Sequence, residues 1–388
     1  MRVLHILEAT GGGTRRHILD LLPALQARGI RCDLIYSLLR NSQFAQDAAC
    51  LEKLGVGVHE IPMERGWGGR CDAAAVRGIY QHLGSHEYNL IHLHSTKAGI
   101  LGRLAQPFAA RRTPLVYTPH CLAFDTALPY RPRRAARLLE KLLAPCTDHF
   151  IAVSRHEQRV MLRANLCRRE RASVIHNGLD ITAFDALLQS PLRHRTTAPP
   201  GFIIGSFGRL TRQKNQSALL HALPIIRRAV PDARLLLVGG GEDEAALRRL
   251  AEYYRIDKDV LWTGELAEAR HLYAHCDVIA QPSRWEGCPY SILEAMAARR
   301  PVLSSAAGGV PELLNGCQRN RAGIICAPCR PQDLAHEITA LAADAAARQR
   351  LGEIARQRVE EEFPLAAMVD KTVAVYQSLQ KRRSTPPA

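Results

Sequence analysis

The chain has 388 residues, which at roughly 100–200 residues per domain predicts two or three domains, each with a full core. Hydrophobic residues make up 47% and charged residues 23%, a balance that excludes a disordered, collagenous or coiled-coil chain. Because no apolar run reaches about 18 residues, we expect no membrane-spanning helix, and Met1–Glu8 is predicted to be a first strand rather than a signal peptide.

The formal net charge of +15 is unevenly distributed. Residues 1–200 carry 27 Lys/Arg against 16 Asp/Glu, whereas residues 201–388 carry 25 against 21. A basic N-terminal half indicates either an anionic partner or simply an Arg-rich solvated surface. Aromatic residues are only 5% and are not interleaved with the arginines, which argues against a nucleic-acid partner.

The eleven cysteines are scattered and, without a secretion signal, are expected to be reduced thiols of a cytoplasmic protein. Cys326 and Cys329 form the single C-x-x-C pair, and no second pair at regular spacing accompanies it. We therefore expect no zinc or redox site there. The cysteines are at positions 32, 50, 71, 121, 146, 167, 276, 288, 317, 326 and 329.

Short apolar runs alternate with amphipathic stretches through the first half of the chain, which predicts strands and helices in turn. This alternation is typical of a parallel sheet with right-handed crossovers. The predicted strands are Val3–Leu7, Cys32–Tyr36, Val56–Ile61, Leu90–His94, Leu115–Thr118, Phe150–Val153 and Ser173–His176. The predicted helices are His17–Ala27, Ala73–Leu83, Ala98–Phe108, Arg133–Leu143 and His156–Ala164.

Residues 190–201, with the sequence SPLRHRTTAPPG, interrupt this pattern and predict a linker, after which the alternation restarts. The next predicted strands are Phe202–Ser206, Leu235–Val238, Val260–Thr263, Val278–Gln281, Val302–Ser304 and Gly323–Cys326. The predicted helices are Gln216–Ala229, Glu244–Tyr254, Arg270–Ala274 and Ile292–Ala298, followed by 331–344, 346–361 and 365–380.

The predicted fold is therefore α/β, with two tandem Rossmann-like domains facing a central cleft. The expected boundaries are 1–190 for the first domain, 191–201 for the linker, 202–364 for the second domain and 365–388 for a last helix and tail. Such sheets bind ligands beyond the carboxyl ends of their strands. Two facing sites favour an enzyme that joins two substrates. A two-domain protein that closes on one ligand is the alternative, but that class usually carries an export signal.

Strand ends of the first domain carry the first candidate site residues. Gly11, Gly12 and Gly13 follow the first strand and open a helix, where backbone N–H groups suit an anion. Their spacing is not G-x-G-x-x-G, so a dinucleotide site is disfavoured, and a tight turn is the alternative. Residues 91–99 and 117–120 are two more strand ends, and we expect His120 to lie in the cleft.

Strand ends of the second domain carry cations and carboxylates. Arg209 and Lys214 flank a strand end just before a helix, an arrangement suited to a diphosphate, although two solvated cations would look the same. Glu286 and Glu294 bracket a strand-to-helix junction in WEGCPYSILEAM at 285–296. Carboxylates accept hydrogen bonds from sugar hydroxyls, and the N–H groups of Cys288–Ser291 between them suit a phosphate. Sugar and phosphate together indicate a nucleotide sugar.

These motifs resemble the retaining glycosyltransferases of family four, which have the GT-B fold of two Rossmann-like domains. The resemblance covers nearly the whole chain and is strongest in FGRLxxQKN at 207–215, EGCPYSILEAMA at 286–297 and AGGVPE at 307–312. Weaker marks are HNGLD at 176–180, STKAG at 95–99 and YTPH at 117–120. The last two are similar to the subgroup that builds bacterial surface polysaccharides.

The resemblance implies a role for each matching position. Arg209 and Lys214 would hold the donor diphosphate and stabilise it as a leaving group, and His120 would approach the donor sugar. Glu286 would hold hydroxyls of the donor sugar, and Glu294 those of the ribose. No metal or other cofactor is implied, because cations and helix dipoles take that part. The final helix would return to the N-terminal domain. The remaining donor-binding positions are Gly12, Gly13, Gly208, Gly287, Cys288, Pro289, Tyr290 and Ser291.

Two positions depart from the family pattern, and both concern the acceptor side. Cys121 stands where relatives often have Gly, and the run from Thr14 to His17 stands where they often have Glu. The donor-side residues are all present. The candidate acceptor-side residues are Thr14, Arg16, His17 and Lys97.

The predicted activity is a retaining, metal-independent hexosyl transfer from a nucleoside diphosphate sugar, with UDP favoured. The acceptor would be a hydroxyl of a glycan or a polyprenyl-diphosphate-linked glycan, in bacterial lipopolysaccharide, capsule or exopolysaccharide synthesis. A nucleotide-sugar epimerase of the same fold, a phosphorylase and a non-catalytic sugar-nucleotide sensor are the alternatives. A phosphorylase would need a lysine-bound pyridoxal phosphate, for which no motif is evident.

Residues 130–144 predict a basic amphipathic helix. Four leucines recur at helical spacing, and five cations accompany them. Either the leucines face the core and the cations face water, or the cations contact anionic lipid at the inner face of the cytoplasmic membrane. The leucines are Leu138, Leu139, Leu142 and Leu143, and the cations are Arg131, Arg133, Arg134, Arg137 and Lys141.

Overall fold

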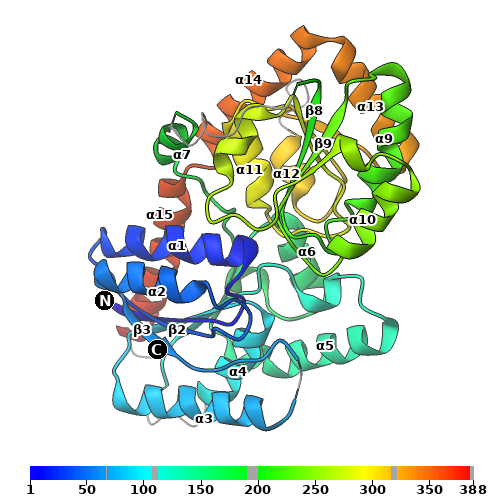
Figure 1. The fold of residues 1–388 in the computed structure, drawn as a ribbon. Helices are drawn as coiled ribbons and strands as arrows, with labels where there is room; N and C mark the ends of the chain where they lie inside the picture. The colour runs from blue at the N-terminus through cyan, green and yellow to red at the C-terminus, as the bar shows by residue number, and fades with distance from the viewer. Residues whose placement is uncertain (67, 107–111, 190–199, 316–320, 328, 385–388) are drawn as a thin grey trace. The chain divides into compact units, whose positions relative to one another are not determined.

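The structure, a computed structural model, describes residues 1–66, 68–106, 112–189, 200–315, 321–327 and 329–384 (Figure 1). The chain divides into two compact units. Unit 1 contains Met1–Asn177 and the C-terminal segment from Ala366, and unit 2 contains Gly178–Leu365. Both units are built on parallel sheets, so the predicted α/β fold of two Rossmann-like units is confirmed.

Unit 1 holds a seven-stranded sheet in the order β3-β2-β1-β4-β5-β6-β7, in which every pair of neighbours is parallel. The strand order reverses between β1 and β4, which pair directly. The strands are β1 Arg2–Leu7, β2 Arg31–Tyr36, β3 Gly57–Glu60, β4 Leu90–His94, β5 Leu115–Thr118, β6 His149–Ala152 and β7 Ala172–Val174. The helices are α1 Gly12–Gln26, α2 Phe44–Lys53, α3 Arg70–Ser85, α4 Thr96–Ala105, α5 Tyr130–Leu143, α6 Arg155–Arg163 and α15 Leu365–Ser384.

The two faces of the unit 1 sheet differ in polarity. Alternate residues such as Leu4, Ile6 and Leu93 pack in an apolar core with α3 and α4. Because side chains alternate along a strand, His5, His92 and His94 share the opposite face. There His92 contacts the hydroxyl of Tyr376 on α15. The sheet therefore carries a row of buried imidazoles on one of its faces.

Unit 2 holds a six-stranded sheet in the order β10-β9-β8-β11-β12-β13, again with every neighbouring pair parallel. The order reverses between β8 and β11. The strands are β8 Ile203–Phe207, β9 Arg234–Val238, β10 Val260–Trp262, β11 Val278–Gln281, β12 Val302–Ser304 and β13 Ile324–Ile325. The helices are α7 Ile181–Leu188, α9 Ser217–Ala229, α10 Glu244–Tyr253, α11 Tyr290–Ala297, α12 Val310–Leu314, α13 Pro331–Ala343 and α14 Ala345–Glu362.

Several predicted boundaries differ from the structure. The chain passes from unit 1 to unit 2 after Asn177, earlier than the predicted linker 191–201, most of which lies outside the described residues. Helix α7 belongs to unit 2, where Asp185 accepts from Arg356 of α14 at 2.6 Å. The predicted helix Arg270–Ala274 is a 3-10 helix, Arg270–His275. The sequence reading missed α2, α7 and α12.

Two expectations about the whole chain can be compared with the described residues. No helix among them combines the length and the apolarity of a membrane span. Ten of the eleven cysteines lie in the described part of the chain, and each is a free thiol. The eleventh, Cys317, lies outside it.

Candidate functional site

The candidate donor site lies at the carboxyl ends of β8 and β11, where the strand order of unit 2 reverses and such sheets bind ligands. The loops that follow the two strands are tied together by hydrogen bonds. Gln213 Nε2 donates to the Trp285 carbonyl (2.9 Å), and Asn215 Nδ2 donates to the Pro282 carbonyl (3.1 Å). The Arg284 amide donates to the Gln213 carbonyl (2.8 Å). Residues far apart in sequence thus form one loop platform.

Lys214 and Glu286 meet on this platform. The Lys214 ammonium donates to Glu286 Oε1 at 2.7 Å, and the two side chains are only 14% and 8% exposed. From the sequence, we expected Lys214 to bind the diphosphate of a ligand and Glu286 to bind its sugar. An ammonium has three N–H donors, so Lys214 can keep Glu286 and still donate to an anion. Arg209 is exposed, and its carbonyl accepts from Gln216 Nε2 at 3.0 Å.

Glu294 accepts a hydrogen bond from Tyr273, a residue that the sequence analysis did not identify. Tyr273 is fully buried, donates to Glu294 Oε2 at 3.1 Å and stacks on Phe207 at 3.7 Å between ring centroids. Burial and the neighbouring Glu294 raise the pKa of Tyr273 well above its usual value, so its hydroxyl stays a donor. No local pattern marks Tyr273, because it belongs to a short 3-10 helix, Arg270–His275, that contains no recognisable motif.

Helix α11 begins at Tyr290, directly after Gly287–Pro289, and has no acidic residue in its first turn. The start of the helix therefore presents its partial positive charge to this platform. Thr211 Oγ1, Ser283 Oγ and Ser291 Oγ are buried hydroxyl oxygens that have no protein partner within the described residues. Hydroxyls, a cation and carboxylates around a helix N-terminus can recognise a phosphorylated sugar.

Two glycines outside the predicted site shape the platform by close approach. A Cβ on Gly308 would lie 1.8 Å from the Glu286 carbonyl oxygen, and one on Gly239 would lie 2.4 Å from that of Gly208. Both have positive φ, 52° and 128°. The sequence offered a signal for each, the AGG run at 307–309 and the GGG run at 239–241, but no role was assigned to them.

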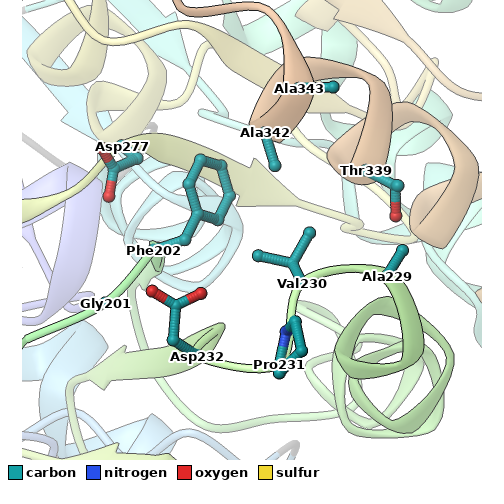
Figure 2. A pocket seen from close by; sticks show the side chains of 10 residues that line it. All are labelled: Gly201, Phe202, Ala229, Val230, Pro231, Asp232, Asp277, Thr339, Ala342 and Ala343. Atoms are coloured by element: carbon teal, nitrogen blue, oxygen red, sulfur yellow. The ribbon is translucent and has the colours of Figure 1, made fainter.

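A pocket in unit 2 lies at the opposite ends of the strands (Figure 2). Phe202, Asp232 and Asp277, which precede β8, β9 and β11, line it together with Thr339 of α13. None of the predicted site residues lines this pocket. Because α/β sheets bind ligands at carboxyl strand ends, we assign it no role in donor binding.

In unit 1, the predicted loop residues lie at the point where the strand order reverses. Helix α1 begins at Gly12, so Gly12 and Gly13 form its exposed N-terminus, and Thr14 lies in its first turn. Arg16 is ion-paired with Asp20 on the same helix at 2.7 Å. Lys97 is buried and paired with Asp72 of α3 at 2.6 Å, which makes it part of the packing of α3 against α4.

His120 belongs to a cluster of five histidines. His94 Nδ1 lies 3.2 Å from His120 Nε2, and His94 Nε2 lies 3.0 Å from His5 Nδ1. His17 Nδ1 lies 3.0 Å from Asn177 Oδ1, and its ring centroid is 4.6 Å from that of His120. The fifth member, His92, lies 2.8 Å from Thr118 Oγ1. The sequence named only His17 and His120 of these five.

Burial keeps this cluster neutral. It lowers the pKa of His5 to about 3 and that of His17 to about 4, and it lowers those of His92, His94 and His120 well below the ordinary value. Neighbouring imidazoles lower each of these pKa values further, except that of His17. Each ring therefore carries one N–H and one lone pair at neutral pH.

The backbone around the cluster is strained. Ser95, His120 and Cys121 have φ values of 76°, 60° and 140°, in the region that favours glycine. Such conformations cost of order 1–3 kcal/mol each and gather at functional sites. The structure therefore marks the ends of β4 and β5 as a candidate site on geometric grounds.

Comparisons with known proteins identify related sequences and structures for both halves of the chain. Residues 11–183 match the family model "Glycosyltransferase Family 4", and residues 193–358 match "Glycosyl transferases group 1". A UDP-Gal:alpha-D-GlcNAc-diphosphoundecaprenol alpha-1,3-galactosyltransferase of Escherichia coli is 29% identical over 61% of this chain and 63% of its own length. The match thus spans just under two thirds of that relative.

Two further similar proteins extend over more of the chain. The capsular polysaccharide biosynthesis glycosyltransferase CapM of Staphylococcus aureus is 23% identical over 83% of this chain and 85% of its own. The crystal structure of Anabaena HepE in complex with UDP and glucose superposes with a TM-score of 0.80 at 23% identity, and covers 97% of this chain and all of that one. This likeness shows the GT-B fold.

Proposed function

We propose that this chain, which belongs to glycosyltransferase family four, transfers a sugar from a UDP-sugar to a hydroxyl of a glycan or polyprenyl-diphosphate-linked glycan in bacterial polysaccharide synthesis. The observation that carries the proposal is the loop platform of unit 2, on which Lys214 and Glu286 pair beside the N-terminus of α11. A cation for a diphosphate and a carboxylate for sugar hydroxyls are what a nucleotide-sugar donor requires.

In this mechanism each donor-side residue has one task. Arg209 and Lys214 hold the diphosphate, Glu286 orients the sugar, and Glu294 binds the ribose. As the bond from the sugar to the diphosphate breaks, the cations stabilise the charge that develops on the leaving oxygen. The acceptor oxygen forms its bond on the same face and gives its proton to the leaving diphosphate, so the anomeric configuration is retained.

The activities named for the relatives support the choice of substrates. The Escherichia coli relative is described as using UDP-Gal and a diphosphoundecaprenol-linked sugar, and HepE was crystallised with UDP and glucose. CapM is described as acting in capsular polysaccharide biosynthesis. We extend these descriptions to this chain as a UDP-sugar donor and a glycan acceptor that is free or linked to a lipid diphosphate.

The proposal is tested by measuring release of UDP from a panel of UDP-sugars, with and without lipid-diphosphate-linked acceptors. Release that depends on acceptor is expected. Lys214→Ala should lower turnover by roughly tenfold to a thousandfold, the cost of one lost electrostatic contact in a preorganised site. The exposed Lys258→Ala is the matched control and should leave turnover unchanged.

Two other outcomes would favour the alternatives. Conversion of the donor sugar without release of UDP would indicate an epimerase, and binding without any turnover would indicate a sensor. We also propose that transfer needs no metal, so turnover should survive an excess of chelator. Loss of turnover in chelator that Mg²⁺ or Mn²⁺ restores would contradict the metal-free mechanism.

We further propose that the protein works in the cytoplasm and attaches loosely to the inner face of the cytoplasmic membrane through α5. Leu138 and Leu142 are 58% and 67% exposed, so the alternative in which all four leucines of this helix face the core is wrong for these two. Arg131, Arg134 and Lys141 are exposed on the same helix. Exposed leucines flanked by cations are complementary to an anionic lipid surface.

A further inference from the structure

Three imidazoles of unit 1 lie close together. One ring nitrogen of each of His17, His94 and His120 lies within 4.8 Å of those of the other two. The ring centroids are 4.6 Å apart for His17–His120, and 5.5 Å apart for His94–His120 and for His17–His94. Three imidazoles on a tetrahedral ion, with metal–nitrogen bonds of about 2.0–2.1 Å, have centroids roughly 5 Å apart.

The nitrogen atoms of His94 and His120 fit the same arrangement. His94 Nδ1 and His120 Nε2 are 3.2 Å apart, and the corresponding separation on a tetrahedral ion is about 3.3 Å. His17 donates from Nδ1 to the amide oxygen of Asn177 at 3.0 Å, because that oxygen can only accept. Nε2 of His17 therefore carries the lone pair of this ring and is the nitrogen left for a metal ion.

Two of the three rings are oriented by partners behind them. Asn177 is 4% exposed and fixes His17, and His5 fixes His94 through the 3.0 Å contact between His94 Nε2 and His5 Nδ1. Ligating histidines almost always donate their second ring N–H to such a partner, which sets the tautomer and the ring orientation. The third ring, His120, is only partly buried, so a fourth coordination position can stay open to water.

We propose that His17, His94 and His120 form a binding site for a divalent transition-metal ion of the zinc class. Imidazole suits Zn²⁺, Co²⁺, Ni²⁺ and Cu²⁺, and three nitrogen ligands with one open position are a common arrangement for Zn²⁺. The site lies outside the donor platform and is not needed for the transfer reaction. An ion held there would occupy the lone pair of His120, which makes the site inhibitory for any step that uses this residue.

A second triad in the same cluster, His5, His92 and His94, is the competing location. Its rings are less evenly spaced, because the His92 and His94 centroids are 4.0 Å apart whereas the other two separations are 5.4 and 5.3 Å. Both nitrogens of His92 also have hydroxyl partners, Tyr376 and Thr118. The triad around His120 therefore fits a metal ion better, and His17 and His92 distinguish the two triads.

The test is titration of the full chain with Zn²⁺ by calorimetry and with Co²⁺ by visible absorption, without donor or acceptor. One equivalent of Co²⁺ should bind with the intense absorption of a tetrahedral ion. His17→Gln should abolish this absorption, and Asn177→Ala should weaken Zn²⁺ binding by about tenfold to a hundredfold. His92→Gln, in the competing triad, and His82→Gln, in the separate cluster with His59 and His86, should leave binding unchanged.

Failure of the proposal has a distinct signature. Absence of Zn²⁺ binding in the unaltered chain would overturn it, and so would binding that survives His17→Gln but is lost in His92→Gln. Because substitution of a buried histidine can unfold the chain, each variant is compared by circular dichroism. In the unaltered chain, metal-induced shifts of the His17 and His120 imidazole resonances give an independent measurement; signals that do not move would contradict the assignment. None of these measurements depends on transferase activity.

Discussion

Cys121 carries a side chain where the backbone favours none. Its φ of 140° lies in the region that glycine adopts. Cys121→Gly should therefore raise the free energy of unfolding by about 1 kcal/mol, the strain relieved less the greater entropy of an unfolded glycine. Cys121→Ala removes the thiol but keeps Cβ, so it should not stabilise the chain. Denaturant titration distinguishes them, and equal stabilities would show that the strain is not relieved.

Glu157 is a buried carboxyl whose charge the fold disfavours. Burial raises its pKa from 4.5 to about 7, although its Oε2 accepts from the Val153 amide at 2.8 Å. The folded chain thus binds this proton more tightly than the unfolded chain. The stability that the proton confers is complete below pH 4.5 and is lost as the pH rises through 7.

Glu157→Gln should remove this pH dependence, because an amide keeps the acceptor oxygen and cannot ionise. Relative to the variant, the unaltered chain should lose about 2–3 kcal/mol of unfolding free energy between roughly pH 5 and 8. The exposed Glu170→Gln is the control that reports on a solvated carboxyl. The buried histidines, whose pKa values are lowered, change stability in the opposite direction, and the difference between variants cancels their contribution. If the unfolding free energies of the unaltered chain and the variant changed equally with pH, the raised pKa of Glu157 would be refuted.

The positions of residues within a local motif could be predicted from the sequence, and those of isolated residues could not. Lys214, Glu286 and Glu294 lie in motifs whose spacing places them at strand ends. Tyr273 and His5 have no such pattern. Each contacts a residue, Glu294 or His94, that only the folded chain brings close to it. The pairing of Lys214 with Glu286 was also missed, since it depends on two loops 72 residues apart lying side by side.

At the scale of elements, the strands were predictable because their apolar runs are buried on both faces of a parallel sheet. The missed helices have weaker signals. Helix α12 has five residues, and α2 buries only Phe44, Ala48 and Leu51. Short helices with few buried positions show little periodicity, and tertiary packing holds them in place.

The loop after β12 supports the loop after β11. Because a Cβ on Gly308 would lie 1.8 Å from the Glu286 carbonyl oxygen, Gly308→Ala must displace the Glu286 loop. We expect this variant to lower turnover at least tenfold, since misplacement by about 1 Å costs about a hundredfold in a preorganised site. Gly264→Ala is the control, because it also has a positive φ of 66° but has nothing within 4 Å of the added Cβ. Equal turnover in both variants would remove the supporting role of Gly308.

At the scale of the whole molecule, most of the excess of positive charge lies in residues 1–200, with 27 Lys/Arg against 16 Asp/Glu. Helix α5 concentrates that charge beside exposed Leu138 and Leu142. Each basic residue near an anionic bilayer contributes about 1 kcal/mol, screened by salt. Three cations and two leucines are thus enough for reversible attachment of a protein whose proposed acceptor is anchored in lipid.

Cosedimentation with neutral and anionic vesicles at two salt concentrations tests this attachment. Binding to anionic vesicles should fall as salt rises, and Arg131→Glu, Arg134→Glu and Lys141→Glu together should abolish it. These three are chosen because Arg133 and Arg137 donate to the carbonyls of Phe124 and Arg163, so replacing them would also disturb packing.

The matched control has the same change in net charge on unit 2, through Arg249→Glu, Arg255→Glu and Lys258→Glu, all exposed. It should bind vesicles as the unaltered chain does. Leu138→Ser with Leu142→Ser should weaken binding but keep its salt dependence, because only the apolar contribution is lost. If both triple variants bound equally, net charge alone would draw the protein to lipid and α5 would have no special part. Equal binding to neutral and anionic vesicles would exclude the electrostatic contribution altogether.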